Sequence, residues 1–152
     1  MSSDKESSNG IRSGNAWEGL TVTPDGKSLF IAVESSLKQD GPIASPINSG
    51  TSRLLQFSID ADGRPSKQLH EYLYINDPVP QVSKFGINDN GVSEVMALND
   101  HFWSSNVPAE TSVLGSMTGI TLSSFMVDLT AASDIKNIDS LQDWSINPRW
   151  QS

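Results

Sequence analysis

The chain has 152 residues, a formal net charge of −8 and no cysteine. This length is enough to bury one sizeable hydrophobic core, and the absence of cysteine excludes disulfides and thiolate metal sites. The ten basic residues are scattered among 18 acidic ones, which argues against nucleic-acid binding, because phosphate backbones are bound by clustered Lys and Arg. No apolar run approaches the roughly 18 residues that indicate a membrane span. We therefore expect an acidic protein without a membrane span, whose compartment the composition leaves open.

The first element that the sequence predicts is a β-hairpin near the N-terminus. Two runs of β-forming residues, 19–23 and 29–33, flank the segment Pro24-Asp25-Gly26-Lys27. Proline sets φ at the second turn position, and Asp-Gly supplies the left-handed conformation of a tight turn. Glu18 precedes the first strand and Glu34 follows the second. Because an antiparallel hairpin brings these ends together, two carboxylates are expected at one rim of a sheet, where they are accessible to a cation or a basic group.

The remaining sequence predicts further strands and no helix. Residues 37–51 contain Gly, Pro and Ser without periodicity, which indicates a long surface loop. Residues 53–60 alternate between two faces, and residues 67–75 return after a turn, so they predict a second hairpin. Residues 88–91 (Asn-Asp-Asn-Gly) have the composition of a turn. Two more strands are expected at 92–98 and 120–129. Since no segment has a sustained helical period, the fold class is all-β.

Several short motifs of this chain resemble those of one protein family. Trp17-Glu18-Gly19-Leu20, followed by Pro24-Asp25-Gly26 and by Glu34-Ser35, is similar to the opening pattern of the phytase-like family, which is also described as esterase-like activity of phytase. The segments 52–57, 91–98 and 127–135 resemble the family's next landmarks, in the same order. The resemblance covers residues 15–141.

The resemblance implies a β-propeller fold. A propeller contains about 4–8 four-stranded blades of roughly 40–50 residues each, so this chain would hold only about two to three blades. We therefore expect an incomplete β-propeller of antiparallel hairpins with long loops, a fragment of a larger protein. Residues 15–141 would form this partial domain, residues 1–14 a disordered segment and residues 142–152 a C-terminal tail. Open sheet edges would favour self-association. Members of the family are often secreted or periplasmic, whereas this chain shows no signal peptide.

The resemblance also implies hydrolysis of a small-molecule phosphate or carboxylic ester, assisted by a cation. Glu18 and Glu34 are the predicted catalytic residues. Together with Glu94 they are the predicted ligands of Ca²⁺, a hard cation that takes about 6–8 oxygen ligands. Arg53 is predicted to bind an anionic group of the substrate through its guanidinium.

For each of these residues a structural role is the alternative. Each glutamate would then be a solvated strand end or the partner of a salt bridge, and Arg53 would pair with a structural carboxylate. A second class of function also stays open, a non-catalytic β-propeller-type domain that binds a partner or serves as a scaffold.

The resemblance is interrupted after Phe102. Family members continue with a strand similar to Phe-Leu-Val-Leu-Glu-Arg, whereas this chain has Trp-Ser-Ser-Asn-Val at 103–107. Removing one T from TTT-CTG-GTC-CTC-GAA-CGT converts the encoded family residues into those of this chain. We hypothesise that residues 103–117 are translated out of frame; genuine divergence in a loop is the alternative. In either case Ser-Ser-Asn-Val-Pro predicts a turn in place of a buried strand. Because this strand and most blades would be missing, we expect the hydrolytic activity to be impaired or absent.

Overall fold

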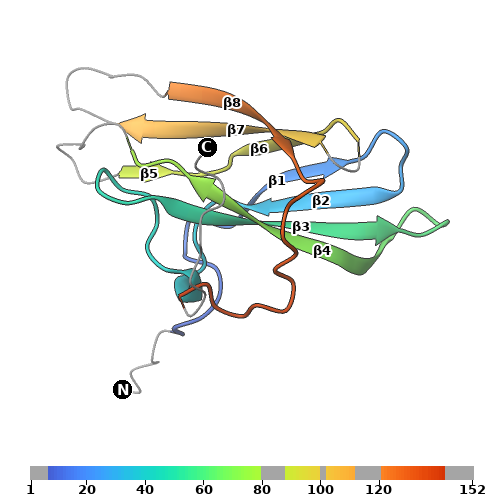
Figure 1. Ribbon diagram of the computed structural model, residues 1–152, viewed down its shortest axis with the longest axis horizontal. Coiled ribbons are helices and arrows are strands. Elements are labelled where there is room, and N and C mark those ends of the chain that lie inside the picture. Colours follow the sequence, from blue (N-terminus) through green and yellow to red (C-terminus); the bar gives the residue numbers. More distant parts are fainter. Residues whose placement is uncertain (1–6, 80–87, 100–101, 112–120, 143–152) are drawn as a thin grey trace.

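The computed structural model describes residues 7–79, 88–99, 102–111 and 121–142, of which 88–89, 102–111 and 121–123 are described by their backbone alone. This part of the chain is all-β, as the sequence predicts, and its only helical element is the single 3₁₀ turn η1 (Lys38–Asp40). Figure 1 shows the strands arranged as two sheets that lie one above the other. The described residues include no helix with the length and apolar character needed to cross a membrane.

The first sheet contains four antiparallel strands in chain order. The turn between its first two strands has the predicted chemistry: Gly26 has φ +72°, and the Thr23 hydroxyl donates to Asp25 Oδ1 at 2.7 Å. Both predicted hairpins are therefore confirmed, with bounds that differ by a few residues. The strands are β1 (Trp17–Val22), β2 (Ser28–Val33), β3 (Gly50–Ile59) and β4 (Pro65–Asn76).

The second sheet is also antiparallel, and its strands are β5 (Asn88–Asn90), β6 (Glu94–Ala97), β7 (Phe102–Thr111) and β8 (Thr121–Asp128). β5 and β6 lie end to end along one edge of β7, and β8 pairs with the other edge. The strands predicted at 92–98 and 120–129 are confirmed with shorter bounds. The turn predicted at 88–91 is wrong for its first three residues, which form β5.

The prediction of a turn after Phe102 is also wrong, because β7 continues through this segment to Thr111. Ser and Asn have only weak local preferences, and pairing with strands on both sides outweighs them. Pro108 lies opposite Leu122 of β8, but the register of β5 and β6 skips positions 107 and 108. This interruption of the ladder is a place where a proline, which has no N–H to donate, is tolerated. The frame-shift hypothesis concerns the gene and stays a prediction; residues 112–117 lie outside the described part of the chain.

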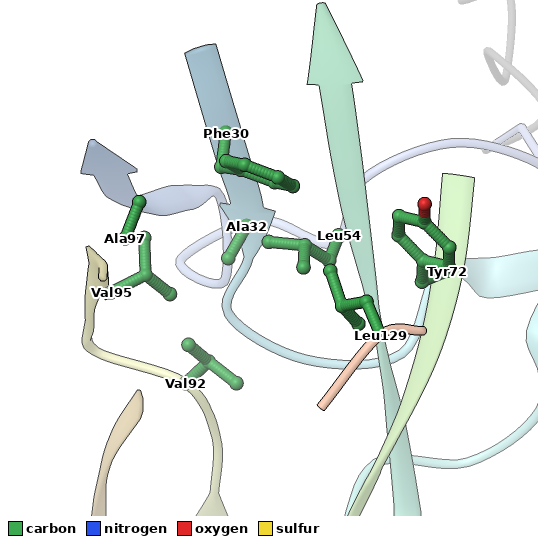
Figure 2. Packing of buried hydrophobic residues seen from close by; sticks show 8 residues of the cluster. All are labelled: Phe30, Ala32, Leu54, Tyr72, Val92, Val95, Ala97 and Leu129. Carbon is green, nitrogen blue, oxygen red and sulfur yellow. The ribbon is translucent and has the colours of Figure 1, made fainter. Parts of the chain in front are cut away.

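The hydrophobic core lies between the two sheets. Strand register places one face of β2, β3 and β4 toward the second sheet, where β6 supplies the opposing side chains. Figure 2 shows these side chains converging from both sheets. Each fully buried apolar side chain contributes roughly 1.5–3 kcal/mol relative to an exposed one, so this cluster is the main attachment between the sheets. Its members are Phe30, Ala32, Leu54, Tyr72, Val92, Val95, Ala97 and Leu129.

Two segments outside the strands are attached to the first sheet. The Arg12 guanidinium donates to the carbonyl oxygens of Ser36 and Gly41, so the N-terminal segment contacts the chain after β2 at this residue. After β8, the chain runs past β4 to the side of the first sheet away from β5–β8, and reaches η1 (Figure 1). There the Ser140 hydroxyl donates to the carbonyl oxygen of Gln39 at 2.7 Å.

Candidate active site

The predicted meeting of two acidic strand ends is present in the structure. Glu18 is the extra residue of a β-bulge between Trp17 and Gly19, and its side chain is exposed. Glu34 follows β2, is half-buried, and donates its backbone N–H to the carbonyl oxygen of Ala16 at 2.9 Å. The start of β1 and the end of β2 are therefore adjacent, and both glutamates belong to this end of the first sheet.

The second sheet approaches the first at this same end, because two glycines leave room for it. A Cβ on Gly19 would lie 2.8 Å from a methyl carbon of Val95, and a Cβ on Gly91 would lie 2.6 Å from the carbonyl oxygen of Glu34. The Val92 N–H donates to that same carbonyl oxygen at 2.8 Å. We call this line of contact between β1–β2 and Gly91–Ala97 the seam.

The seam brings the third predicted acid to the same end. Gly19 contacts Val95, and the backbone N–H of Ala97 donates to the Thr21 hydroxyl at 3.2 Å, so β1 and β6 run side by side in the same direction. Glu94 immediately precedes Val95, as Glu18 precedes Gly19. The two acids therefore occupy equivalent positions on neighbouring strands.

These three carboxylates do not form a compact ligand cluster. In the part of the chain that the structure describes, no group of three or more His, Cys, Asp or Glu side chains is arranged to hold a metal ion. Glu18, Glu34 and Glu94 thus share one end of the seam without making such a group. Calcium binding by this set of three stays a prediction, and no chemical step below depends on it.

Arg53, the predicted substrate-binding residue, is engaged by protein groups. Its Nε and Nη2 donate to the two oxygens of Asp40 at 2.6 and 2.8 Å, and its Nη1 donates to Glu71 at 2.7 Å. The carbonyl oxygens of Ile138 and Asp139 accept from Nη1 and Nη2 at 3.0 and 3.5 Å. A guanidinium has five N–H groups, and each nitrogen here has protein acceptors. This geometry supports the alternative interpretation, a structural role for Arg53. None of the seam glutamates is among its partners.

The electrostatics of Arg53 agree with a structural role. Burial by itself lowers the pKa of the guanidinium, but the hydrogen bonds from Asp40 and Glu71 outweigh it and hold the pKa above its ordinary value. The side chains of Arg53 and Asp40 are 7% and 0% exposed. Arg53 therefore joins β3, β4, η1 and the segment at 138–139 in one buried ion cluster.

A second polar contact attaches the C-terminal segment to the edge of β4. His70 Nδ1 lies 2.9 Å from Asp134 Oδ2, while Asp134 Oδ1 accepts the backbone N–H groups of Glu71 and Lys136. Burial raises the pKa of Asp134, but the hydrogen bonds from Lys136, His70 and Glu71 outweigh this and lower the pKa below 3.8. The His70 ring is thus hydrogen-bonded to a surface carboxylate, and His101 lies outside the described residues.

Sequence reasoning missed the partners of Arg53. Asp40 lies in the segment 37–51, which the sequence predicted as a featureless loop, and Glu71 lies within a strand pattern where an acid carries no special signal. Only the folded arrangement brings these carboxylates to one guanidinium. No local motif would have identified them.

The fold and the seam define an acidic all-β protein that carries carboxylates where its two sheets meet. A family model described as "Phytase-like: Esterase-like activity of phytase" matches residues 1–151. The chain belongs to this phytase-like family, as the resemblance of its motifs predicts. No curated protein and no solved structure matches it.

Proposed function

We propose that this protein is a hydrolase of phosphate or carboxylic esters, and that the reaction takes place at the acidic end of the seam. The observation that carries the proposal is the convergence of Glu18, Glu34 and Glu94 on the junction of the two sheets in a member of a family described by its esterase-like activity. Ligand and active sites commonly lie at such junctions between structural units.

The chemistry needs one group that takes a proton from water and one that supplies a proton to the leaving-group oxygen. We assign the first role to Glu18, whose exposed position on a bulge gives it access to water and substrate. Glu34 is half-buried beside the second sheet and is assigned the second role. Bulges often re-aim side chains next to active sites, which supports the choice of Glu18.

The proposal includes the propeller architecture of the family. β1 to β4 would form one blade, since four antiparallel strands in chain order are the unit of a propeller. β6, β7 and β8 would form part of the next blade. The equivalent positions of Glu18 and Glu94, each near the start of the first strand of its proposed blade, support this repeat.

The test is hydrolysis of p-nitrophenyl phosphate and p-nitrophenyl acetate by the full chain. We expect slow turnover, because β7 lacks the Glu-Arg pair of the family pattern. Glu18→Gln and Glu34→Gln should each lower it by a factor of about 10²–10⁴, the usual contribution of a general acid or base. Asp62→Asn, a change of an exposed turn carboxylate, is the matched control and should leave the rate unchanged.

The alternative is a non-catalytic binding or scaffold domain. Its support is the exposure of apolar side chains on β1, where Leu20 and Val22 are 61% and 46% exposed on the face away from the core. Exposed apolar surface of this kind is typical of contact regions. A folded protein that hydrolyses neither ester, or whose turnover survives both glutamate changes, would exclude the proposed hydrolase and leave this alternative.

A further inference from the structure

A row of polar side chains crosses the first sheet beside the seam, on the face that packs against the second sheet. The Ser52 hydroxyl donates to the carbonyl oxygen of Glu34 at 2.7 Å, and Asn76 Nδ2 donates to the Ser52 hydroxyl at 2.9 Å. Ser52 and Asn76 are each only 1% exposed. The row therefore connects the ends of β2, β3 and β4 in a region that water does not reach from outside.

These hydrogen bonds determine how the Asn76 amide is oriented. The Ser52 hydroxyl has one hydrogen, and it goes to a carbonyl oxygen that can only accept. Ser52 must then accept from Asn76, so the amide presents its nitrogen to Ser52 and turns its oxygen away. Among the described residues this buried amide oxygen, Asn76 Oδ1, has no hydrogen-bond partner. A buried polar atom without a partner is costly and calls for a ligand, an ion or a water molecule.

The second sheet brings another amide, that of Asn90, to this end of the seam, next to the Glu34 side chain of the first sheet. Asn90, 5% exposed, donates its Nδ2 to the carbonyl oxygen of Asp77 at 2.8 Å, so its amide also gives its nitrogen to the protein. A Cβ on Gly91 would lie 3.0 Å from Glu34 Cγ. Glycine at this position therefore makes the space that the Glu34 side chain occupies next to Asn90.

We propose that Glu34, Asn76 and Asn90 bind a hard divalent cation of the Ca²⁺ type through their side-chain oxygens. One carboxylate and two amide oxygens are ligands that Ca²⁺ takes readily, with waters and carbonyl oxygens completing its coordination of about 6–8 oxygens. Glu34 and Asn76 belong to the first sheet, and Asn90 belongs to the second. The cation thus connects the two sheets at the acidic end of the seam. This role is structural. It uses the ionised form of Glu34, whereas the proposed hydrolysis uses the protonated form, so the two roles of this residue are separate proposals with separate tests.

The test uses the full chain, freed of metal with EDTA and dialysed, and measures CaCl₂ binding by isothermal titration calorimetry. We expect one site. At a calcium concentration about 100 times Kd, the Tm should rise by about 5–10 °C, the linkage expected for a chain of this size. NaCl at equal ionic strength should have no such effect, and MgCl₂ a smaller one, because Mg²⁺ dehydrates reluctantly.

Variants then assign the site to these residues. Glu34→Gln keeps the shape and removes the charge, so Ca²⁺ affinity should fall by about tenfold or more. Asn76→Asp adds a buried carboxylate, so without calcium, in EDTA, the Tm should be lower than that of the wild type. Adding Ca²⁺ should then raise the Tm by more than it does in the wild type. Asn90→Asp is the second such variant if Asn76→Asp does not fold. Glu18→Gln, which changes an acid at the same end of the seam outside this set, is the matched control and should bind Ca²⁺ normally.

The absence of single-site calcium binding would overturn the proposal, and so would equal affinity in Glu34→Gln. Equal destabilisation of Asn76→Asp with and without Ca²⁺ would identify the row as a water-filled hydrogen-bond network. These readouts are binding and Tm, so a failure here is distinguishable from a failure of the proposed hydrolysis.

Discussion

Replacement of Arg53 by methionine should destabilise this protein more than any other single change of a charged side chain described here. Methionine keeps much of the length and apolar stem of arginine but provides no donor. Asp40 and Glu71, 0% and 11% exposed, would lose the cation that they share. Removing one member of a buried ion pair costs about 3–5 kcal/mol, because the remaining charge is left uncompensated. This is a large fraction of a typical free energy of unfolding of about 5–15 kcal/mol.

Urea denaturation at pH 7, followed by circular dichroism and tryptophan fluorescence, measures the loss. The matched control is Arg64→Met: Arg64 lies 3.5 Å from Asp62, and the two side chains are 83% and 59% exposed. A surface pair of this kind contributes about 0–1 kcal/mol. The triple variant Arg53→Met, Asp40→Asn, Glu71→Gln should recover part of the stability, since it removes the buried charges together with their partner. Equal losses for Arg53→Met and Arg64→Met would refute the reasoning, as would a triple variant less stable than Arg53→Met.

Two further predictions concern the seam and the C-terminal segment. Gly91→Ala should lower the free energy of unfolding, measured by urea denaturation, by about 1–3 kcal/mol, because the added methyl group would clash with the backbone oxygen of Glu34. This oxygen cannot move away without breaking its hydrogen bond to Val92. A loss below about 0.5 kcal/mol would mean that the sheets are not packed this closely. The depressed pKa of Asp134 predicts a stabilisation that is complete above pH 3.8 and is lost as the pH falls through the lower pKa of the folded state. Asp134→Asn should therefore be less stable than the wild type at pH 7, by about 1 kcal/mol or less because the carboxylate is partly exposed, and the difference should vanish once the pH is below the pKa of the folded state. A difference that stays constant from neutral to acidic pH would exclude this origin.

Local patterns predicted most of the first sheet. The turn at Pro24–Lys27 depends on residues within the turn itself, and the structure places Gly26 in the left-handed region that the Asp-Gly pair predicted. The alternation of residues 53–60 and 67–75 likewise predicted β3 and β4. Alternation did not tell which face would be covered, because Leu55, Phe57 and Ile59 form the more apolar face of β3, yet Leu54 and Gln56 on the opposite face are the buried ones. The second sheet covers Leu54, which is 1% exposed, while Leu55 on the other face stays half-buried.

The second sheet shows where local preferences are insufficient. Ser104, Ser105 and Asn106 favour turns by themselves, yet each has partners in β6 and β8. Pairing with the neighbouring strands determined the conformation of this segment, and a short stretch of sequence does not show which strands will lie beside it. The same holds for β5, whose residues pair with the end of β7.

The candidate site also combines features that the sequence determined with features that only the tertiary structure decided. The sequence by itself determined that Glu18 and Glu34 lie at adjacent strand ends, because a tight turn between two β-forming runs pairs those runs as an antiparallel hairpin. Only the tertiary structure decided that Glu94 joins them across the seam, and that Arg53 is held by carbonyl groups more than 80 positions further along the chain, at separations of 85 and 86 residues. Turn chemistry acts between neighbours in the chain, whereas burial and ion pairing depend on which distant segments the packing of the two sheets brings into contact.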